Sequence, residues 1–416
     1  MNSFVETSLR NFCSTRDIFG DQSAVYVHFE KKPEGKEKQY GFNSGIIFGH
    51  IVYRTEQNEV KVSVPLMLKN MISKPYCQDY ILVQYSNEIY FYTRALPLFQ
   101  QLGDLQKHLP KFYDSYIHSS LSTTDVILIY EDLKAKGFRD HERFSFLDLE
   151  HLTLMVRALG QFHSYSYFAK SQNPLEFSAL GKWFNYAEAE LIRTRPNYFQ
   201  LFARIGLNRL RADPRYSSHI AKVEKIIENA DALVLQVNTM ERKEPMSVLC
   251  HGDFLRGNVM FRYENSQLVD MKMIDMATCR IASPVVDLSL VLYLNADQQT
   301  RSQHWDHLID AYYEGLHQVF GGIGVPSRES ILKEFTTKAL YGYLIASHFL
   351  PSLIEMDRGI ISSFLDYLPS EFIGRPQSEI PESVFKDTIK RWCNEGGAEA
   401  EALADILRDM IDRRFI

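Results

Sequence analysis

The first third of the chain alternates short apolar runs with polar turns, which is the pattern of β-strands. The runs are rich in β-branched and aromatic residues, and they predict strands at 24–29, 46–53 and 60–68, with two further apolar runs at 113–118 and 126–130. Over 78–94 the apolar residues recur at helical spacing, and we expect this helix to end before Pro97. This part of the chain is therefore predicted to be rich in strands.

Beyond about residue 145 the apolar residues recur every three or four positions, as on one face of an amphipathic helix. Helices are predicted at 146–168, 214–239, 303–320, 328–350 and 399–413. One compact stretch of strands and loops, 248–287, interrupts them. This order predicts an α+β protein of two lobes: a β-rich N-terminal lobe over 1–130, a hinge at 131–139 and a mostly helical C-terminal lobe over 140–416.

Composition places the chain among globular proteins that are soluble. Hydrophobic residues make up 45% and charged residues 24% of the 416 residues, and the formal net charge is −6. No basic block is present, which argues against nucleic acid as a partner, and the apolar runs are too short to cross a membrane. The five cysteines are scattered and no secretory signal is visible, so a disulfide framework is not expected and a cytoplasmic location is.

The stretch 248–287 holds three polar residues at an informative spacing. Asp253 belongs to the sequence H-G-D and precedes Asn258 by five positions, and Asp275 follows an apolar run. A polar turn between two apolar runs predicts a hairpin, which would bring Asn258 and Asp275 together at its open end. The three side chains are therefore expected to lie around one point.

Phosphoryl transfer requires such a set of groups. One carboxylate orients the acceptor hydroxyl and takes its proton, while an amide and a second carboxylate hold Mg²⁺ against the phosphates. The spacing D-x-x-x-x-N equals that of the kinase catalytic loop. We therefore predict Asp253 as the catalytic base and Asn258 and Asp275 as magnesium ligands. Taken singly, each residue is equally explained as a turn former or a strand-end carboxylate; the ordered combination favours the catalytic interpretation.

The motif H-G-D-x-x-x-x-N, followed by I-D and by S-P-V-V-D-L at 283–288, resembles the aminoglycoside phosphotransferase and choline kinase-like group. Within that group it most resembles the ecdysteroid kinase-like (CHK kinase-like) family, over nearly the whole chain from about Gly41. The resemblance implies a bilobal protein kinase-like fold, ATP and Mg²⁺ as cofactors, and a small-molecule hydroxyl acceptor, such as an ecdysteroid or a hydroxylated xenobiotic.

A kinase-like fold also needs a lysine on a strand of the N-terminal lobe and a glutamate on the next helix. Lys69 ends the apolar run 64–68, and Glu88 lies within the predicted helix 78–94. In such folds the lysine contacts the α- and β-phosphates and the glutamate holds it in place. Both residues are alternatively explained as solvated surface charges; their order and context favour the functional interpretation.

Two loops complete the predicted nucleotide site. Gly41, Asn43 and Ser44 lie between two strand candidates, where a loop that covers phosphates belongs, although the same composition marks an ordinary hairpin turn. Glu131 and Leu133 resemble the segment of the family that links the lobes and meets the adenine through backbone groups. The acidic pair there is equally explained as a helix cap or an exposed loop.

Other residues are assigned structural roles or depart from the family pattern. His163 resembles a family histidine and is expected to be structural, and Asp287 is expected to cap or brace the catalytic segment. Met276 replaces the aromatic residue that usually follows the second aspartate. Three further departures or irregular positions are Leu255, Gly257 and Pro65, the last inside the strand assigned to Lys69.

These observations predict an ATP- and Mg²⁺-dependent kinase that phosphorylates a small alcohol. A catalytically inactive protein that binds nucleotide or hormone is the alternative, although such a protein has no need to retain the complete polar set. A protein kinase is disfavoured, because H-R-D and an A-P-E-like segment are missing. The sequence predicts no oligomeric state.

Overall fold

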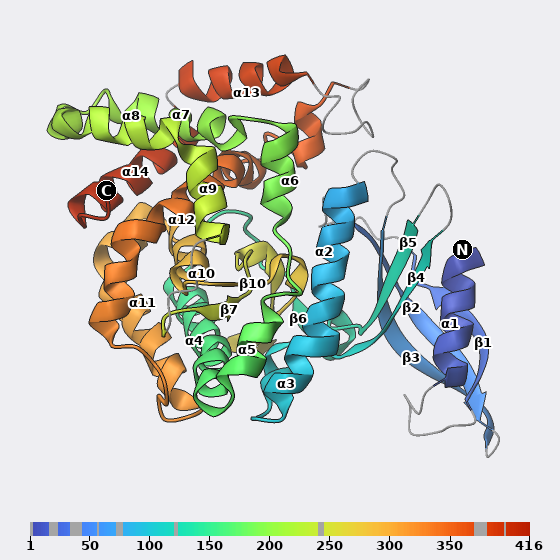
Figure 1. The fold of residues 1–416 in the computed structure, drawn as a ribbon. Coiled ribbons are helices and arrows are strands. Elements are labelled where there is room, and N and C mark those ends of the chain that lie inside the picture. The colour runs from blue at the N-terminus through green and yellow to red at the C-terminus, as the bar shows by residue number, and fades with distance from the viewer. Residues whose placement is uncertain are drawn as a thin grey trace.

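The computed structural model describes residues 3–15, 24–33, 44–55, 58–71, 78–119, 124–239, 245–369, 381–394 and 397–416. Figure 1 shows two lobes, with the strands of the N-terminal lobe on the right and the helices of the C-terminal lobe on the left. The predicted α+β class, with a β-rich N-terminal lobe and a mostly helical C-terminal lobe, is confirmed.

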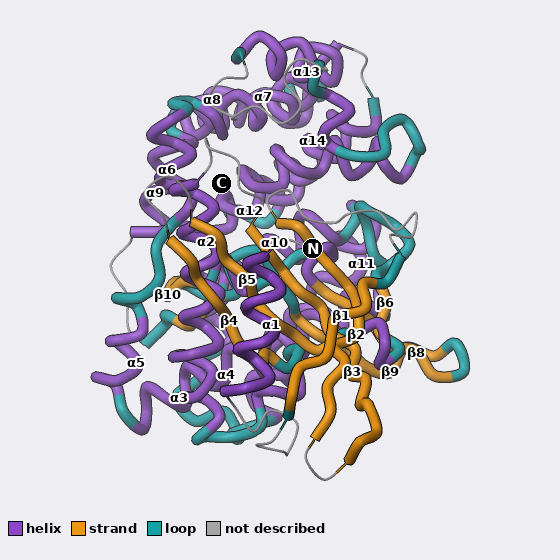
Figure 2. The backbone as a smooth tube through the Cα atoms, turned by 90° about the vertical axis from the view of Figure 1, so that its right-hand side faces the viewer, coloured by secondary structure: helices purple, strands orange, loops and turns teal. Residues whose placement is uncertain are grey.

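The N-terminal lobe, as far as it is described, is built on an antiparallel sheet of five strands in the order β1-β2-β3-β5-β4. These strands are β1 (Val25–Lys31), β2 (Ser44–Thr55), β3 (Asn58–Met71), β4 (Phe112–Ser119) and β5 (Thr124–Glu131). Helix α1 (Ser3–Thr15) covers one face of the sheet (Figure 2), where it shares a core with Leu68 and Ile129. Helix α2 (Gln78–Tyr90) packs with Leu128 on the opposite face.

Alternation along β3 decides where Lys69 points. Successive residues of a strand face opposite sides of a sheet. Leu68 belongs to the core beneath α1, so Lys69 faces α2 instead and stands opposite Leu128 of β5. The strand that the sequence assigned to Lys69 therefore delivers the ammonium group to the side of the sheet that faces the rest of the molecule.

Pro65 is accommodated at an edge of the sheet. It lies opposite His50 of β2 in a regular stretch of the β2–β3 pairing, and the pairing of β3 with β5 begins only at Leu66. At Pro65, β3 is therefore paired with β2 and not with β5. On the side without a neighbouring strand, the N–H that proline lacks would have no ladder hydrogen bond to make. An edge position, not a bulge, explains this proline.

The predicted end of the helix at 78–94 was wrong. After α2, a π-helical turn η1 (Phe91–Ala95) leads into α3 (Leu96–Gln100), and Pro97 occupies the first turn of α3. Proline fits there because the N–H that it lacks would have no helical partner in a first turn. Helical backbone therefore continues past the expected boundary.

The C-terminal lobe is mostly helical. Its elements are α4 (Leu149–Gln172), α5 (Pro174–Leu180), α6 (Ala187–Thr194), α7 (Tyr198–Leu210), η4 (Pro214–His219), α8 (Ile220–Glu228), α9 (Ala230–Thr239), β7 (Val248–Cys250), η5 (Arg256–Asn258), β8 (Val259–Glu264), β9 (Gln267–Met273), η6 (Met276–Thr278), β10 (Arg280–Ala282), α10 (Val285–Leu290), η7 (Val291–Asn295), α11 (Gln298–Gln318), α12 (Arg328–Asp357), η8 (Phe364–Tyr367), α13 (Glu382–Asn394) and α14 (Ala398–Asp412).

Two helix predictions in this lobe had wrong bounds. The single helix predicted at 214–239 is divided into η4, α8 and α9, because Asn229 ends α8: its side-chain Nδ2 donates to the Lys225 carbonyl at 2.7 Å. The helix predicted at 328–350 extends to Asp357 and contains Pro351. In both regions the helical periodicity of the sequence was correct, and only the bounds differ.

The segment between the lobes is more ordered than the loop predicted there. It contains η3 (Lys134–Lys136) and β6 (Phe138–Arg139) directly after β5, whereas η2 (Leu105–His108) lies earlier in the chain, between α3 and β4. Strand β6 joins the hairpin of β8 and β9 in a sheet of order β6-β8-β9, with Phe138 opposite Arg262. The connection between the lobes is thereby fixed to the hairpin that carries the candidate magnesium ligands.

Helices α4 and α11 touch through their backbones. A Cβ atom on Gly160 would lie 2.1 Å from the Tyr312 carbonyl oxygen, and one on Gly315 would lie 2.1 Å from the Arg157 carbonyl oxygen. Only glycine allows so close an approach at these positions. Because α4 also holds β7, through a hydrogen bond from the Leu249 N–H to Ser166 Oγ, this crossing supports the strand that leads into H-G-D.

Within the described ranges, no helix combines the length and apolar character needed to span a membrane.

We expect Gly160→Ala to destabilise the protein. In an unconstrained helix this substitution stabilises by about 1 kcal/mol, but here the added methyl group must separate two helices whose backbones touch. Overpacking of this kind typically costs about 1–3 kcal/mol, so the free energy of unfolding in urea should fall. Gln172→Ala, at an exposed position of the same helix, is the control and should change it by about 0.5 kcal/mol or less. An unfolding free energy that rises in Gly160→Ala would contradict the close crossing.

Candidate active site

The loop after β7 begins with a glycine that no other residue can replace without strain. Gly252 has φ of +85°, and a Cβ atom there would lie 2.0 Å from the Thr278 carbonyl oxygen. The loop starts where β7 pairs with β10, with Cys250 opposite Arg280. This close packing turns the chain sharply and places Asp253 at the seam between the lobes.

Asp287 braces the start of this loop, as predicted. Its Oδ2 accepts a hydrogen bond from the His251 N–H at 2.7 Å, and its Oδ1 accepts one from the Gly252 N–H at 2.8 Å. His163 Nε2 lies 3.1 Å from Oδ2, and its Nδ1 lies 2.9 Å from the Tyr312 hydroxyl, so His163 is structural. Burial alone would raise the pKa of Asp287, but the hydrogen bond and charge of His163 lower it below its usual range. The brace is therefore an ionised carboxylate.

Asp253 and Asn258 are in direct contact. The Asn258 side-chain Nδ2 donates to the Asp253 carbonyl oxygen and to Asp253 Oδ2, both at 2.9 Å. The five-residue spacing in the sequence is thus the length of a loop whose first and last residues are hydrogen-bonded to each other. Burial and, next, the charge of Asp275 raise the pKa of Asp253 to about 7, and the bond from Asn258 opposes this shift.

The predicted hairpin brings Asp275 to the same place. Strands β8 and β9 pair in register, with Val259 opposite Met273, and the Ile274 N–H donates to the Asn258 carbonyl oxygen at 3.0 Å. Asp275 itself has φ of 64°, a left-handed conformation that is strained for a residue with a side chain. Such strain is often stored at functional sites, where the surrounding structure imposes it.

Lys69 connects the two lobes through three charged groups. Its Nζ lies 2.5 Å from Glu88 Oε2 and 2.8 Å from Asp275 Oδ1, and Glu88 Oε1 accepts a hydrogen bond from the Tyr130 hydroxyl at 2.8 Å. Burial alone would lower the pKa of Lys69, but the carboxylates of Asp275 and Glu88 raise it. Burial raises the pKa of Glu88, whereas Lys69 outweighs burial at Asp275 and lowers the pKa of that carboxyl. Of the predicted C-terminal site residues, the structure thus brings Asp275 into direct contact with Lys69.

The hinge presents an apolar cluster and paired charges. Leu133 packs with Phe138 and Met260, and Ile274 lies against them, in a small cluster separate from the main core. Glu131 Oε1 accepts a hydrogen bond from the Lys111 N–H at 2.8 Å, so its side chain turns back toward the N-terminal lobe. These apolar side chains pack between the hinge and the hairpin.

Asp132, between the two predicted hinge residues, has a structural role. Its Oδ1 accepts a hydrogen bond from the Lys134 N–H at 2.9 Å at the start of η3, and its Oδ2 lies 2.7 Å from Lys32 Nζ. One of the acidic pair is thus a helix cap, as the alternative interpretation of that pair stated.

The predicted phosphate loop is described only in part. Gly41 and Asn43 lie outside the described residues. The backbone of Ser44 begins β2 and stands opposite Met71, two residues beyond Lys69 on β3. The end of the loop therefore lies beside the strand that carries the lysine.

Sequence reasoning missed Asn87, a buried side chain that joins three segments. Its Nδ2 donates to the Asn185 carbonyl at 2.8 Å and to the Ala277 carbonyl at 3.0 Å, and its Oδ1 accepts from the Asn185 N–H at 3.0 Å. It thereby ties α2 both to the segment before α6 and to the turn after Asp275. In the sequence, only its position next to Glu88 pointed to a role at the site, because its partners lie about a hundred or more residues away.

The sequence also missed a buried ion pair beside the loop. Arg280 Nη2 donates to Glu188 Oε1 at 2.6 Å, and Arg280 Nε donates to the Thr278 carbonyl at 3.0 Å. The two partners are far apart in the chain and belong to no motif, so no spacing signalled them. Met276, the departure after the second aspartate, is fully buried and thus fills core volume instead of lining a surface.

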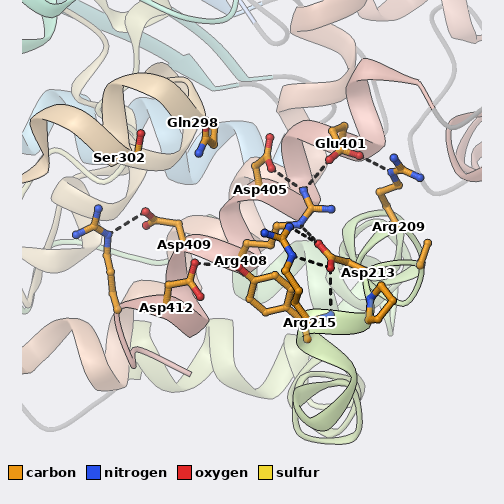
Figure 3. Close-up of a pocket in the computed structure, with 14 residues that line it drawn as sticks. Arg209, Asp213, Arg215, Gln298, Ser302, Glu401, Asp405, Arg408, Asp409 and Asp412 are labelled. Atoms are coloured by element: carbon orange, nitrogen blue, oxygen red, sulfur yellow. Dashed lines mark hydrogen bonds and ion pairs between the residues drawn. The ribbon is translucent and has the colours of Figure 1, made fainter.

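A cavity lies away from this cluster. It has a volume of about 880 Å³ and is lined by charged residues of the C-terminal lobe, from the ends of α7 and α11, from η4 and from α14 (Figure 3). Arg408 stands at its centre, 2.7 Å from Glu401, 2.6 Å from Asp405 and 3.3 Å from Asp213. Because these charges neutralise one another, we assign the cavity a structural role.

A model of the ecdysteroid kinase-like family matches residues 41–324. No curated protein matches the chain. The solved structures similar to it include the microcompartment-associated aminopropanol kinase, at 10% identity and a TM-score of 0.44 over 92% of this chain and 97% of that one. Others are the macrolide 2′-phosphotransferase MphH from Brachybacterium faecium, at 13% identity and a TM-score of 0.35 over 93% and 97%, and the AMP-bound spectinomycin phosphotransferase APH(9)-Ia, at 12% and 0.38 over 86% and 95%.

Since the family model covers more than half of its residues, the chain belongs to the ecdysteroid kinase-like family. The family predicted from the motifs at 251–288 is confirmed.

We expect Asp287→Asn to loosen the catalytic loop. The amide retains one acceptor oxygen but turns an NH₂ group toward a backbone N–H, so one buried donor loses its partner. Breaking a buried, charge-assisted network of this kind costs about 2–4 kcal/mol, and thermal and urea unfolding should report that loss. Asp306→Asn, which removes an exposed carboxylate paired with Arg328, is the control and should change stability little. Equal stabilities of the two variants would show that Asp287 does not brace the loop.

Proposed function

We propose that this chain transfers the γ-phosphate of ATP to a hydroxyl group of a small molecule. One observation carries the proposal: Lys69 contacts Glu88 and Asp275, and the loop in which Asn258 holds Asp253 is bonded to the residue before Asp275. A charged lysine, two oxygen ligands and a carboxylate base are the parts that phosphoryl transfer requires.

Nucleotide binding is assigned to both lobes. Lys69 would contact the α- and β-phosphates and Glu88 would hold it in place, as in kinases. The backbone of 131–133 would meet the adenine, and the apolar cluster of Leu133, Phe138 and Met260 would enclose the ring. The loop that contains Gly41, Asn43 and Ser44 would cover the phosphates through its N–H groups.

The residues present fit Mg²⁺. Magnesium prefers hard oxygen ligands and usually takes one or two carboxylates together with water and phosphate oxygens. Asn258 uses its Nδ2 to hold Asp253, which leaves its Oδ1 for a cation, and Asp275 uses Oδ1 for Lys69, which leaves Oδ2. The lowered pKa of Asp275 keeps that carboxylate ionised. Bound there, Mg²⁺ would neutralise charge on the phosphates.

Asp253 would act on the acceptor. Its carboxylate accepts the proton of the acceptor hydroxyl while the oxygen of that hydroxyl forms a bond to the γ-phosphorus, and the bond from the γ-phosphorus to the oxygen of ADP breaks. The products are ADP, a phosphate monoester and the proton held on Asp253. Asn258 positions the base, because its two hydrogen bonds fix both the backbone and the side chain of Asp253.

The acceptor class follows from family membership. We propose an ecdysteroid or a hydroxylated xenobiotic, held mostly by apolar surface and a few polar anchors. An inactive nucleotide- or hormone-binding protein is not favoured, because such a protein has no need of a base held by Asn258 beside a complete lysine–carboxylate set. We further propose that the chain works in the cytoplasm; the described cysteines, Cys13, Cys250, Cys279 and Cys393, are all free thiols, which suits a reducing compartment.

Asp253→Asn tests the proposed base. The amide is isosteric but cannot take a proton, so we expect kcat to fall by about 10²- to 10⁴-fold, while the Kd for Mg-ATP changes by no more than a few fold. ADP release with a panel of alcohols and calorimetric titration of nucleotide measure the two quantities. Asp270→Asn, on the same hairpin and paired with Arg262, is the matched control. Full turnover in Asp253→Asn would remove this residue from the role.

Asp275→Asn tests the magnesium site. Loss of one ligand charge should raise the Mg²⁺ concentration that gives half-maximal nucleotide affinity by about tenfold or more. A titration of Mg²⁺ at fixed ATP, followed through nucleotide binding, gives this value without any acceptor. An unchanged Mg²⁺ dependence would exclude Asp275 as a ligand, and chelation with EDTA should abolish turnover in the unmodified protein.

A further inference from the structure

Glu188 is a buried carboxylate that the proposed chemistry leaves unused. It lies on α6 with its side chain 12% exposed. Its Oε1 accepts hydrogen bonds from Arg280 Nη2 at 2.6 Å and from the Tyr341 hydroxyl at 3.3 Å. Its Oε2 is buried, and no residue among those described donates a hydrogen bond to it. A buried acceptor without a donor costs free energy, so it is expected to meet a donor in the working complex.

This carboxylate lies beside the catalytic loop. Its partner Arg280 belongs to β10, which pairs with β7, and a Cβ atom on Gly252 would lie 3.0 Å from Arg280 Nε. Gly252 immediately precedes Asp253, so the ion pair of Arg280 and Glu188 packs against the loop that carries the proposed base. In agreement with this, the charge of Glu188 raises the pKa of Asp253 and that of Arg280 lowers it.

The segment that carries Glu188 is also fixed in place. Asn185, three residues earlier, exchanges two hydrogen bonds with Asn87, and Asn87 also holds the Ala277 carbonyl. Because Asn87 precedes Glu88 on α2, the position of Glu188 is tied to the group that orients Lys69. A group anchored so rigidly can impose an orientation on a bound molecule.

The charges around Glu188 indicate which kind of donor it would accept. Arg280 is 1% exposed and neutralises the carboxylate through Oε1, so the pair carries no net charge. An anionic group on the ligand would face the lone pairs of Oε2 and be repelled by them. A neutral hydroxyl group donates one hydrogen bond and needs no counter-charge, so it is a donor that fits this oxygen.

We propose that Glu188 Oε2 recognises the acceptor by taking a hydrogen bond from a second, neutral hydroxyl group. The acceptor is then a polyhydroxylated molecule, with one hydroxyl at Asp253 and another at Glu188. This inference rests on the proposed phosphotransferase function and adds a specificity-determining residue to it. Sites built to bond a hydroxyl discriminate strongly against analogues that lack it, because the buried partner then stays unpaired.

The test compares Glu188→Gln with the unmodified protein on matched alcohols. The probes are a polyhydroxylated ecdysteroid and analogues that each lack one hydroxyl group. In the unmodified protein, one deoxy analogue should be phosphorylated with a kcat/KM lower by about 10- to 100-fold. In Glu188→Gln, the complete polyol should lose about that factor, mainly through KM, whereas that deoxy analogue should be unaffected. Calorimetric titration of the same alcohols, with Mg²⁺ and a non-hydrolysable ATP analogue, should show the same pattern in Kd.

Two controls separate this effect from a loss of folding. Glu314→Gln removes a carboxylate that is also paired with an arginine, Arg157, but at an exposed position, and it should keep the preference for the complete polyol. Glu188→Asp keeps a charge for Arg280 but withdraws the oxygen, so it should lose the preference while unfolding near the temperature of the unmodified protein.

The outcomes also distinguish the two proposals. If the unmodified protein phosphorylates none of the alcohols, the phosphotransferase function fails, and this inference with it. If it phosphorylates them, but Glu188→Gln keeps the preference for the complete polyol, or no deoxy analogue is disfavoured, the inference alone is overturned.

Discussion

The structure depends on one buried ammonium group that two lobes share. Lys69 comes from the sheet of the N-terminal lobe, Glu88 from the helix packed on it, and Asp275 from the hairpin of the C-terminal lobe. Removing the charges of Lys69 and Glu88 from water is costly, and this cost is repaid only while the ammonium group stays in contact with the two carboxylates. The contact therefore depends on the lobes being held in this arrangement, in which Asp275 also stands next to Ile274, whose N–H donates to the carbonyl oxygen of Asn258.

A second constraint holds the catalytic loop on the C-terminal side. Gly252 allows a turn that any side chain would prevent, and Asp287 receives the two N–H groups that the turn exposes. His163 keeps that carboxylate charged from a helix whose own position is set by a glycine crossing with α11. The loop is thus positioned by the core of the lobe, and Asp253 needs no contact from the N-terminal lobe to face the seam.

Sequence reasoning predicted the parts of the site that depend on local spacing and missed those that depend on distant packing. Asp253, Asn258 and Asp275 lie in one hairpin and its loop, so their meeting could be predicted from 23 residues. Lys69 followed from its place at the end of an apolar run and from the resemblance to a family. Asn87 bonds residues about a hundred or more positions away and Glu188 pairs with a residue 92 positions away, and neither contact leaves a period or a motif in the sequence. The helix end at Asn229 was missed for a different reason, since a local side-chain bond to the Lys225 carbonyl, not the helical periodicity, marks it.

The contacts that the sequence did not reveal join the two halves of the proposed reaction. Asn87 fixes the helix that orients the lysine, the turn that follows Asp275 and the segment that leads to Glu188. A displacement of α2 would therefore shift Glu88, which holds Lys69, together with the segment that carries Glu188. Because all three partners of Asn87 are backbone groups, an exchange of neighbouring side chains would leave the link intact. In the proposed reaction, the side chains around Glu188 could thus be exchanged while Lys69 and Asp275 keep their positions.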